Sequence, residues 1–338
     1  MTRSVKDRLL LPLLFLACIL LLQACQLPIQ PFTSSCKADE QISAVDETKI
    51  GQAALTFVQD ALGENPSAAY SAFTAEAKDK VPLPQFVSAL QSAIKPTGPY
   101  KDLRIVGTYL AQVTGGGREQ RVVCGNLSRP ESWVAVNVKP GPAEAHVVIE
   151  AHTTNNSEVF VVWLLPEQGN WRVQYVHFAL SGVVGKSPAD LRKIAEAEQQ
   201  KQHNLNAFLL FATALQLTDR GPYFQLGIRP DIEKDLSEIK KPEFLVGQPP
   251  FIWNVGTAGS FKLLNVGLIG VGGKIYLQVD HRAAPWTDDK DVVKSNRSLI
   301  AALDSRYPEY REAFAGIVVR AHEDGTNRTY GTVDENKN

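Results

Sequence analysis

Apolar positions in the chain follow a helical period first and a strand-like period afterwards. Between residues 50 and 61 they recur every three or four positions, which predicts an amphipathic helix. Two further helices are expected over 66–80 and 83–94. Segments rich in β-branched and aromatic residues then alternate with turn signals, and strands are predicted over 103–112, 120–125, 133–139, 145–153, 159–165 and 171–178. Helices followed by a meandering antiparallel sheet predict an α+β domain.

The second half of the chain starts with another helix signal. Ser187-Pro188-Ala189-Asp190 combines a hydroxyl cap, an early proline and an early acidic residue. The helix that follows is polar up to residue 204, and its apolar face returns from Leu205. A helix over 288–305 and a hairpin of 317–322 with 328–333 are expected near the end. These patterns predict a second α+β domain.

The two halves also align with each other in part. At an offset of 153, Phe57, Ala61 and Tyr70 fall opposite Leu210, Ala214 and Tyr223. At an offset of 161, a second set of positions around Tyr100 and Phe261 matches. Two amphipathic helices also match this well by chance, so a degenerate copy of the first domain and an unrelated fold both stay open.

The first 24 residues have the three-part pattern of a secretory signal. Arg3, Lys6 and Arg8 precede an unbroken run of 14 apolar residues over 9–22. A helix that spans a bilayer needs about 20 residues, so this run favours a cleaved signal over a short anchor helix. The expected organisation is a signal peptide over 1–24, a flexible tether over 25–44, the first domain over 45–182, a linker helix over 183–204 and the second domain over 205–334.

The end of this run resembles a bacterial lipobox. Leu22-Gln23-Ala24-Cys25 matches the site at which signal peptidase cuts before a cysteine that carries diacylglycerol, and Cys18 is a poorer candidate. The resemblance implies a lipoprotein anchored in the bilayer by acylated (palmitate-type) chains on Cys25. Gln26 follows in place of the aspartate that retains lipoproteins in the inner membrane. The implied location is therefore the outer membrane, with the protein facing the periplasm or the surface.

Two cysteines remain after this assignment. Cys36 and Cys124 would lie in an oxidising compartment, which favours a disulfide between the tether and the first domain. Sequence spacing does not reveal whether two side chains lie close together, so two free thiols stay an equal alternative.

Composition and charge exclude several classes of function. The 338 residues are 44% hydrophobic and 21% charged, which is ordinary globular usage. Lys and Arg number 35 against 36 Asp and Glu, so the formal net charge of −1 gives no reason to expect nucleic-acid binding. The glycine-rich segment 267–274 lacks the spacing and the Ser or Thr of a phosphate loop, and a β-hairpin is predicted there.

Several patterns in the first domain resemble the nuclear transport factor 2-like superfamily, a cone-shaped α+β fold in which a curved sheet wraps a long helix. They are the helix over 53–62, the Ala69-Tyr70-Ser71-Ala72-Phe73 segment, the Gly98-Pro99-Tyr100 entry to the sheet and Gly169-Asn170-Trp171-Arg172-Val173. The resemblance covers residues 45–182. It implies a cone whose mouth binds a small ligand or a protein.

The candidate chemical residues lie on two predicted strands. His146, Glu150 and His152 alternate along one strand, so they share a face and could serve in acid–base catalysis or hold zinc. The simpler interpretation leaves these polar side chains in water, with Val147, Ile149 and Ala151 in the core, and no metal is expected.

On the other strand, Trp171, Val173, Tyr175 and His177 are expected to share a face. If the cone holds a pocket, Tyr70, Trp171, Tyr175 and His177 are its candidate lining residues, with Tyr175 and His177 the favoured pair.

The sequence therefore predicts a non-catalytic envelope lipoprotein that binds a small apolar ligand or an envelope protein, without a cofactor. The alternative is an acid–base enzyme of the isomerase or dehydratase type, with His146, Glu150, His152 or His177 as its working residues. A pocket that holds His146 or His177 beside a carboxylate would favour the enzyme.

Overall fold

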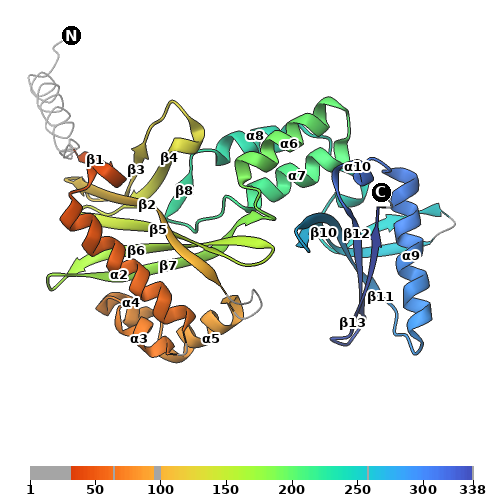
Figure 1. Cartoon of the computed structure of the whole chain (residues 1–338), viewed down its shortest axis with the longest axis horizontal. Helices are drawn as coiled ribbons and strands as arrows, with labels where there is room; N and C mark the ends of the chain where they lie inside the picture. The colour runs from red at the N-terminus through yellow and green to blue at the C-terminus, as the bar shows by residue number, and fades with distance from the viewer. Residues whose placement is uncertain (1–31, 64, 95–99, 257–258, 337–338) are drawn as a thin grey trace, which may run out of the picture.

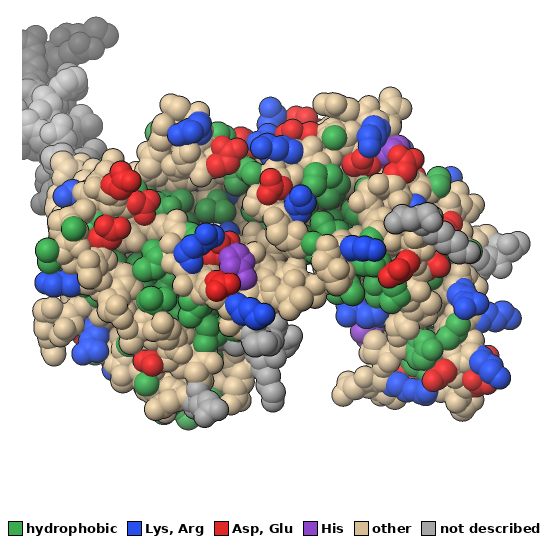
Figure 2. Space-filling view, in the orientation of Figure 1, with side chains coloured by type: hydrophobic (Ala, Val, Ile, Leu, Met, Phe, Trp, Pro, Cys, Tyr) green, Lys and Arg blue, Asp and Glu red, His purple; other side chains and the backbone are tan. Residues whose placement is uncertain are grey.

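The computed structural model describes residues 32–63, 65–94, 100–256 and 259–336 (Figure 1). The chain is a mixed α+β protein, as the sequence predicts. The proposed signal peptide and Cys25 lie outside the described residues. Within those residues, no helix is both long and apolar enough to cross a bilayer. Acidic and basic side chains are interspersed over the face shown in Figure 2.

The N-terminal part, up to residue 183, contains most of the predicted elements. Its helices are α2 (Ala44–Leu62), α3 (Pro66–Ser71), α4 (Ala75–Lys80) and α5 (Leu83–Ile94), and short 3₁₀ turns lie at Asp39–Gln41 and Pro130–Ser132. Its strands are β1 (Thr33–Ala38), β2 (Lys101–Thr114), β3 (Gln120–Gly125), β4 (Trp133–Val138), β5 (Glu144–His152), β6 (Asn156–Glu167) and β7 (Asn170–Val183).

Five of these strands form an antiparallel sheet in the order β1-β2-β5-β6-β7. Helices α2 to α5 cover one face of it (Figure 1). The core between the two layers contains Phe57 from α2 and Ile149, Phe160 and Leu164 from the sheet, each at most 2% exposed. Burial of these side chains supplies the main stabilisation of this part, at about 1.5–3 kcal/mol each.

A second sheet, in the order β3-β4-β8, lies over the opposite face of the first. Val136 and Phe224 of the small sheet pack with Val148 and Val161 of the large one in a second core. Strand β8 (Phe224–Leu226) belongs to the segment that the sequence assigned to the second domain. It pairs with β4, from Val134 opposite Leu226 to Val136 opposite Phe224. The part of the chain beyond residue 205 therefore completes the N-terminal part.

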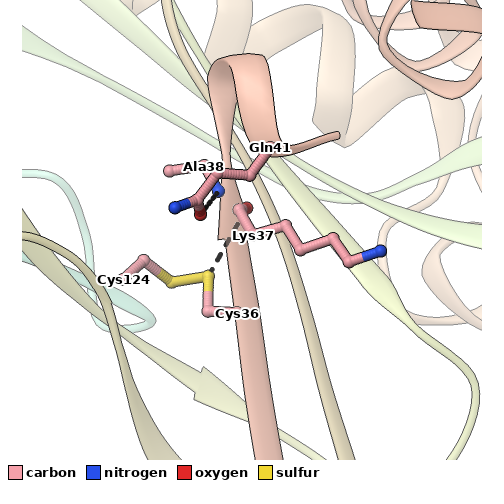
Figure 3. Close-up of a disulfide and its surroundings, with 5 residues drawn as sticks. All are labelled: Cys36, Lys37, Ala38, Gln41 and Cys124. Carbon is pink, nitrogen blue, oxygen red and sulfur yellow. Dashed lines mark hydrogen bonds between the residues drawn. A yellow bond between two sulfur atoms is a disulfide. The ribbon is translucent and has the colours of Figure 1, made fainter. Parts of the chain in front are cut away.

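The expected flexible tether is ordered from Thr33 onward. Strand β1 pairs along its length with β2, and Cys36 of β1 forms a disulfide with Cys124 of β3 (Figure 3). The bond joins the edge strand of the large sheet to the edge strand of the small one across 88 positions of sequence. The expectation of flexibility fails here because both a strand ladder and a covalent bond hold this segment.

The C-terminal part has its own five-stranded sheet. Its helices are α6 (Pro188–Gln200), α7 (Asn204–Gln216), α8 (Arg229–Glu238), α9 (Asp289–Arg306) and α10 (Tyr310–Ala313), with a 3₁₀ turn at Glu243–Leu245. Its strands are β9 (Phe251–Asn254), β10 (Ser260–Val271), β11 (Lys274–Ala283), β12 (Gly316–Glu323) and β13 (Thr329–Glu335). Helices α6, α7 and α8 lie between the two large sheets (Figure 1).

Local signals in this part are confirmed. The side chain of Ser187 caps α6 by accepting a hydrogen bond from the Asp190 N–H. The glycine-rich segment is the β10–β11 hairpin, and its turn residues Gly272 and Gly273 both have positive φ. Two-residue hairpin turns of this kind require positive φ at both positions, which glycine adopts without strain.

The sheet topology separates the two parts. Strand order in the C-terminal sheet is β13-β12-β11-β10-β9, and β11 pairs with β12 in parallel after the α9 crossover. The N-terminal sheet has antiparallel neighbours throughout. The two halves therefore correspond in one feature only among the described residues: α7 packs on β10 as α2 packs on β2.

Candidate functional site

An apolar pocket of about 400 Å³ lies between the helices of the N-terminal part and strand β7. We call it the aromatic pocket. Helices α2, α4 and α5 supply one side of it, and the edge of the sheet at β6 and β7 supplies the other. Its aromatic lining comes from eight residues, and His177 also lines it: Phe57, Phe73, Phe86, Phe160, Trp163, Tyr175, Phe178 and Tyr223. Ligand sites in proteins are concave and mostly apolar with a few polar groups, and this pocket has that character.

Edge-to-face ring contacts hold one wall of the aromatic pocket. Phe73 lies with its ring centroid 5.3 Å from Phe57 and 5.2 Å from Phe86, both in T-shaped geometry. Tyr70 packs behind Phe73 and Phe86 and donates its hydroxyl to the carbonyl of Val81 at 3.1 Å. Tyr70 therefore supports the wall without being part of the lining.

The helix expected over 66–80 is interrupted at this wall. It is two short helices, α3 and α4, and Phe73 forms an isolated bridge with Val173 of β7 between them. Thr74 then caps α4 by accepting from the Ala77 N–H at 3.1 Å. The break brings Phe73 against the sheet, which a continuous helix would not do.

The prediction that Trp171, Val173, Tyr175 and His177 share a face is wrong. A β-bulge interrupts the pairing of β6 with β7: Leu164 lies opposite Val173, but Trp163 lies opposite Tyr175. The extra residue, Gln174, reverses the alternation, because a one-residue insertion moves every later side chain to the other face. Trp171 and Val173 pack towards the helices, as Val176 and Phe178 do, whereas Tyr175 and His177 project from the opposite face of β7. They still line the pocket, because β7 is the edge strand of the sheet and the pocket has lining residues from both of its faces.

A loop from the C-terminal part closes one side of the pocket. The 218–223 loop connects α7 to β8, and its Tyr223 ring lies 4.8 Å from Trp163 and 5.2 Å from Tyr175. Gly221 has a φ of +82°, and a Cβ atom on it would lie 2.8 Å from Cγ of His177. Only glycine fits this close approach without strain. No pattern in the sequence indicates that this loop reaches the pocket, since Tyr223 lies far along the chain from β7.

The His177 imidazole at the pocket edge lies beside the Asp219 carboxylate of this loop, with Nε2 3.3 Å from Oδ2. The two form an ion pair when the imidazole is protonated. Burial raises the pKa of Asp219, but the hydrogen bond from the Gly221 N–H and the neighbouring His177 outweigh it, so the pKa lies below its usual value. The polar groups on the opposite edge are Lys80 and Gln174, of which Gln174 accepts a hydrogen bond from Thr74 at 2.6 Å.

His146, Glu150 and His152 project from the same face of β5, but they do not form a site. His146 is fully buried beneath the small sheet, stacked on Trp163 at 5.7 Å, and burial lowers its pKa to about 3. Glu150 pairs with Arg104 at 2.8 Å and lies 3.6 Å from His152. The expectation that this polar set faces water is wrong for His146, because β3, β4 and β8 cover it.

Two further findings bear on chemistry at these positions. Within the described residues, no three His, Cys, Asp or Glu side chains are arranged to hold a metal ion. Glu144, also beneath the small sheet, has its pKa raised to about 7 by burial, against the lowering effect of the Lys139 N–H.

Comparison with family models, curated proteins and solved structures finds no match to this chain.

Proposed function

We propose that this protein is a lipid-anchored envelope protein with a nuclear transport factor 2-like N-terminal domain, which binds a small apolar ligand in the aromatic pocket. The observation that carries the proposal is the pocket itself: about 400 Å³ lined by phenylalanine, tyrosine and tryptophan rings. An antiparallel sheet with α2 to α5 on one face is in keeping with a cone of that family.

The lining favours an uncharged, flat or branched hydrocarbon with one polar end. Its apolar body would contact Phe57, Phe73 and Phe86, whose ring contacts preform the wall. Preformed walls lower the entropy that is lost on binding. The polar end would lie at the edge, where Gln174 offers an amide and Lys80 an exposed ammonium that is paired with Glu76.

Titration with the fluorescent apolar probe N-phenyl-1-naphthylamine tests this function. Ala89 is an exposed residue of α5 that lines the pocket, so Ala89→Trp should fill its entrance without disturbing the core. Ser88→Trp is the matched control, because Ser88 is exposed on the same helix and does not line the pocket. We expect saturable binding by wild type and Ser88→Trp, weakened about tenfold or more in Ala89→Trp. Equal binding by all three proteins would overturn the proposal.

The His177–Asp219 pair supports acid–base catalysis as a second candidate. A pocket that holds histidine beside a carboxylate meets the condition set from the sequence. However, the ring nitrogen nearest the carboxylate is Nε2, and Nδ1 lies 3.1 Å from the place of a Cβ on Gly221, so the loop backbone occupies the side where a substrate would have to approach. This packing favours binding over catalysis.

Proton exchange distinguishes the second candidate from the first. An isomerase-like site removes a proton next to a carbonyl, so a cyclic ketone incubated with the protein in heavy water would gain deuterium. Exchange that is lost in His177→Gln, with probe binding retained, would establish the enzyme. Exchange no faster than in buffer would leave the binding function alone.

The lipid anchor is supported by the lipobox and by the disulfide, which suits an oxidising compartment. Acyl chains on Cys25 would hold the chain at the outer membrane. Intact mass and membrane fractionation in a Gram-negative host test the anchor. Lipid mass and membrane location should be present in wild type and absent in Cys25→Ala. Unlipidated, soluble wild type would contradict it.

A further inference from the structure

A second, polar pocket of about 290 Å³ lies on the other side of the 218–223 loop, and three arginines line it. We call it the arginine pocket. Arg121 comes from β3, Arg220 from the loop and Arg229 from the start of α8. The strands of the small sheet contribute Asn137 and Gln225. The pocket therefore forms where the chain passes between its two parts.

Arg220 is the central residue of this pocket. Only 7% of it is exposed, and within the described residues no carboxylate lies within ion-pair distance of its guanidinium. Its Nη1 donates to the carbonyls of Leu217 at 2.9 Å and Asp219 at 2.6 Å. A cation at the carboxyl end of α7 is favourable, and these two bonds account for Nη1, one of the three guanidinium nitrogens. Its Nε is buried and has no hydrogen-bond partner among the described residues.

A buried arginine of this kind is costly unless something pairs with it. Burial lowers the pKa of Arg220 to about 10, although the charges of Asp219 and Glu150 act against this. The Asp219 carboxylate also lines the pocket, but its oxygens contact other groups: Oδ1 accepts from the Gly221 N–H at 2.9 Å and Oδ2 lies 3.3 Å from Nε2 of His177. A purely structural arginine would have its remaining donors satisfied by the protein.

Of the other two arginines, one has a carboxylate partner and one does not. Arg229 is paired with Glu233 at 2.7 Å. Arg121 donates to the amide oxygen of Gln225 and has no carboxylate partner among the described residues. The pocket therefore presents two cations, Arg121 and Arg220, that form no ion pair among the described residues, and one lining carboxylate, Asp219.

We propose that the arginine pocket binds the phosphate group of a small soluble molecule, with Arg220 and Arg121 as its two cationic contacts. A phosphate monoester carries more negative charge at neutral pH than a carboxylate, so it gains more from two arginines that form no ion pair of their own. Arginine presents several N–H donors in a planar fork that matches phosphate oxygens. The pocket volume and the polar lining fit a small molecule.

Titration of the full-length protein with inorganic phosphate at constant ionic strength tests this site. Arg121→Gln removes one cation from the pocket, and Arg118→Gln removes an exposed cation three residues earlier that does not line it. We expect saturable phosphate binding that weakens about tenfold in Arg121→Gln and in Arg220→Lys. In Arg118→Gln the change should stay below about twofold.

Three outcomes would overturn the proposal. They are no saturable binding by wild type, equal weakening by Arg118→Gln and Arg121→Gln, and acetate binding as tight as phosphate. Flotation with phosphatidic acid vesicles that is lost in Arg121→Gln would contradict a soluble ligand. Since Ala89→Trp alters only the aromatic pocket, phosphate binding should be unchanged in that variant, and this site stands or falls independently of the apolar ligand.

Discussion

Reduction of the Cys36–Cys124 disulfide should destabilise the N-terminal part strongly. The bond closes a loop of 88 positions. In the chain-entropy model a cross-link of that span removes about 4 to 5 kcal/mol of loop entropy from the unfolded chain. A typical domain is stable by only about 5–15 kcal/mol, so this is a large share of its free energy of unfolding. The bond also holds β1, an edge strand paired on one side with β2.

Urea unfolding followed by tryptophan fluorescence, with and without reductant, measures this effect. The reduced protein should lose about 4 kcal/mol, and hydrogen exchange of the β1 amides should accelerate more than that of β5. The Cys36→Ala/Cys124→Ala variant is the control, because reductant should not change its stability. A loss below about 1 kcal/mol on reduction would refute the entropic argument. Peptide mapping that finds both thiols free in the unreduced protein would refute the bond itself.

Two further predictions concern single side chains. Gly221→Ala should lower the free energy of unfolding by about 1–3 kcal/mol and should also weaken probe binding, because residue 221 has a positive φ and a Cβ there would press against His177. Gly169→Ala is the control: Gly169 has a similar φ but open space around it, so this variant should lose less stability and bind the probe as wild type does. Glu144 has a folded-state pKa of about 7, above its unfolded value, so the folded protein holds the extra proton and wild type loses stability as pH rises from about 4.5 to 7. In urea unfolding, Glu144→Gln should therefore be more stable than wild type by about 1 to 2 kcal/mol at pH 8 and equally stable near pH 4. Glu131→Gln, at an exposed position, is the control and should show no such difference between the two pH values. A change in the stability of Glu144→Gln that is the same at both pH values would contradict the explanation.

The sequence predicted the order of elements well wherever the signal is local. The strand expected over 145–153 is β5, Glu144–His152, and the helix expected over 288–305 is α9, Asp289–Arg306. Period and capping residues determine such segments from their own neighbours. The core positions Val147, Ile149 and Ala151 were also predicted correctly, and all three are buried.

The candidate site was predicted only in part, because long-range contacts build it. Tyr175 and His177 were identified as pocket residues, but the bulge at Gln174 that separates them from Val173 has no signature in the strand pattern. Tyr223 and Asp219 reach the pocket through a loop whose position depends on the pairing of β8 with β4. That pairing joins segments about ninety positions apart, and strand pairing at such separations depends on tertiary packing.

Photo-crosslinking gives the most direct test of the central claim that the aromatic pocket binds an apolar ligand. An uncharged aromatic probe carrying a diazirine would be bound, irradiated and located by peptide mapping. The account predicts labels on α5, near Phe86 and Leu90, and on β7, near Tyr175 and Phe178, that unlabelled N-phenyl-1-naphthylamine competes away. Labels that are spread over the surface, or that gather on the C-terminal sheet and resist competition, would contradict it.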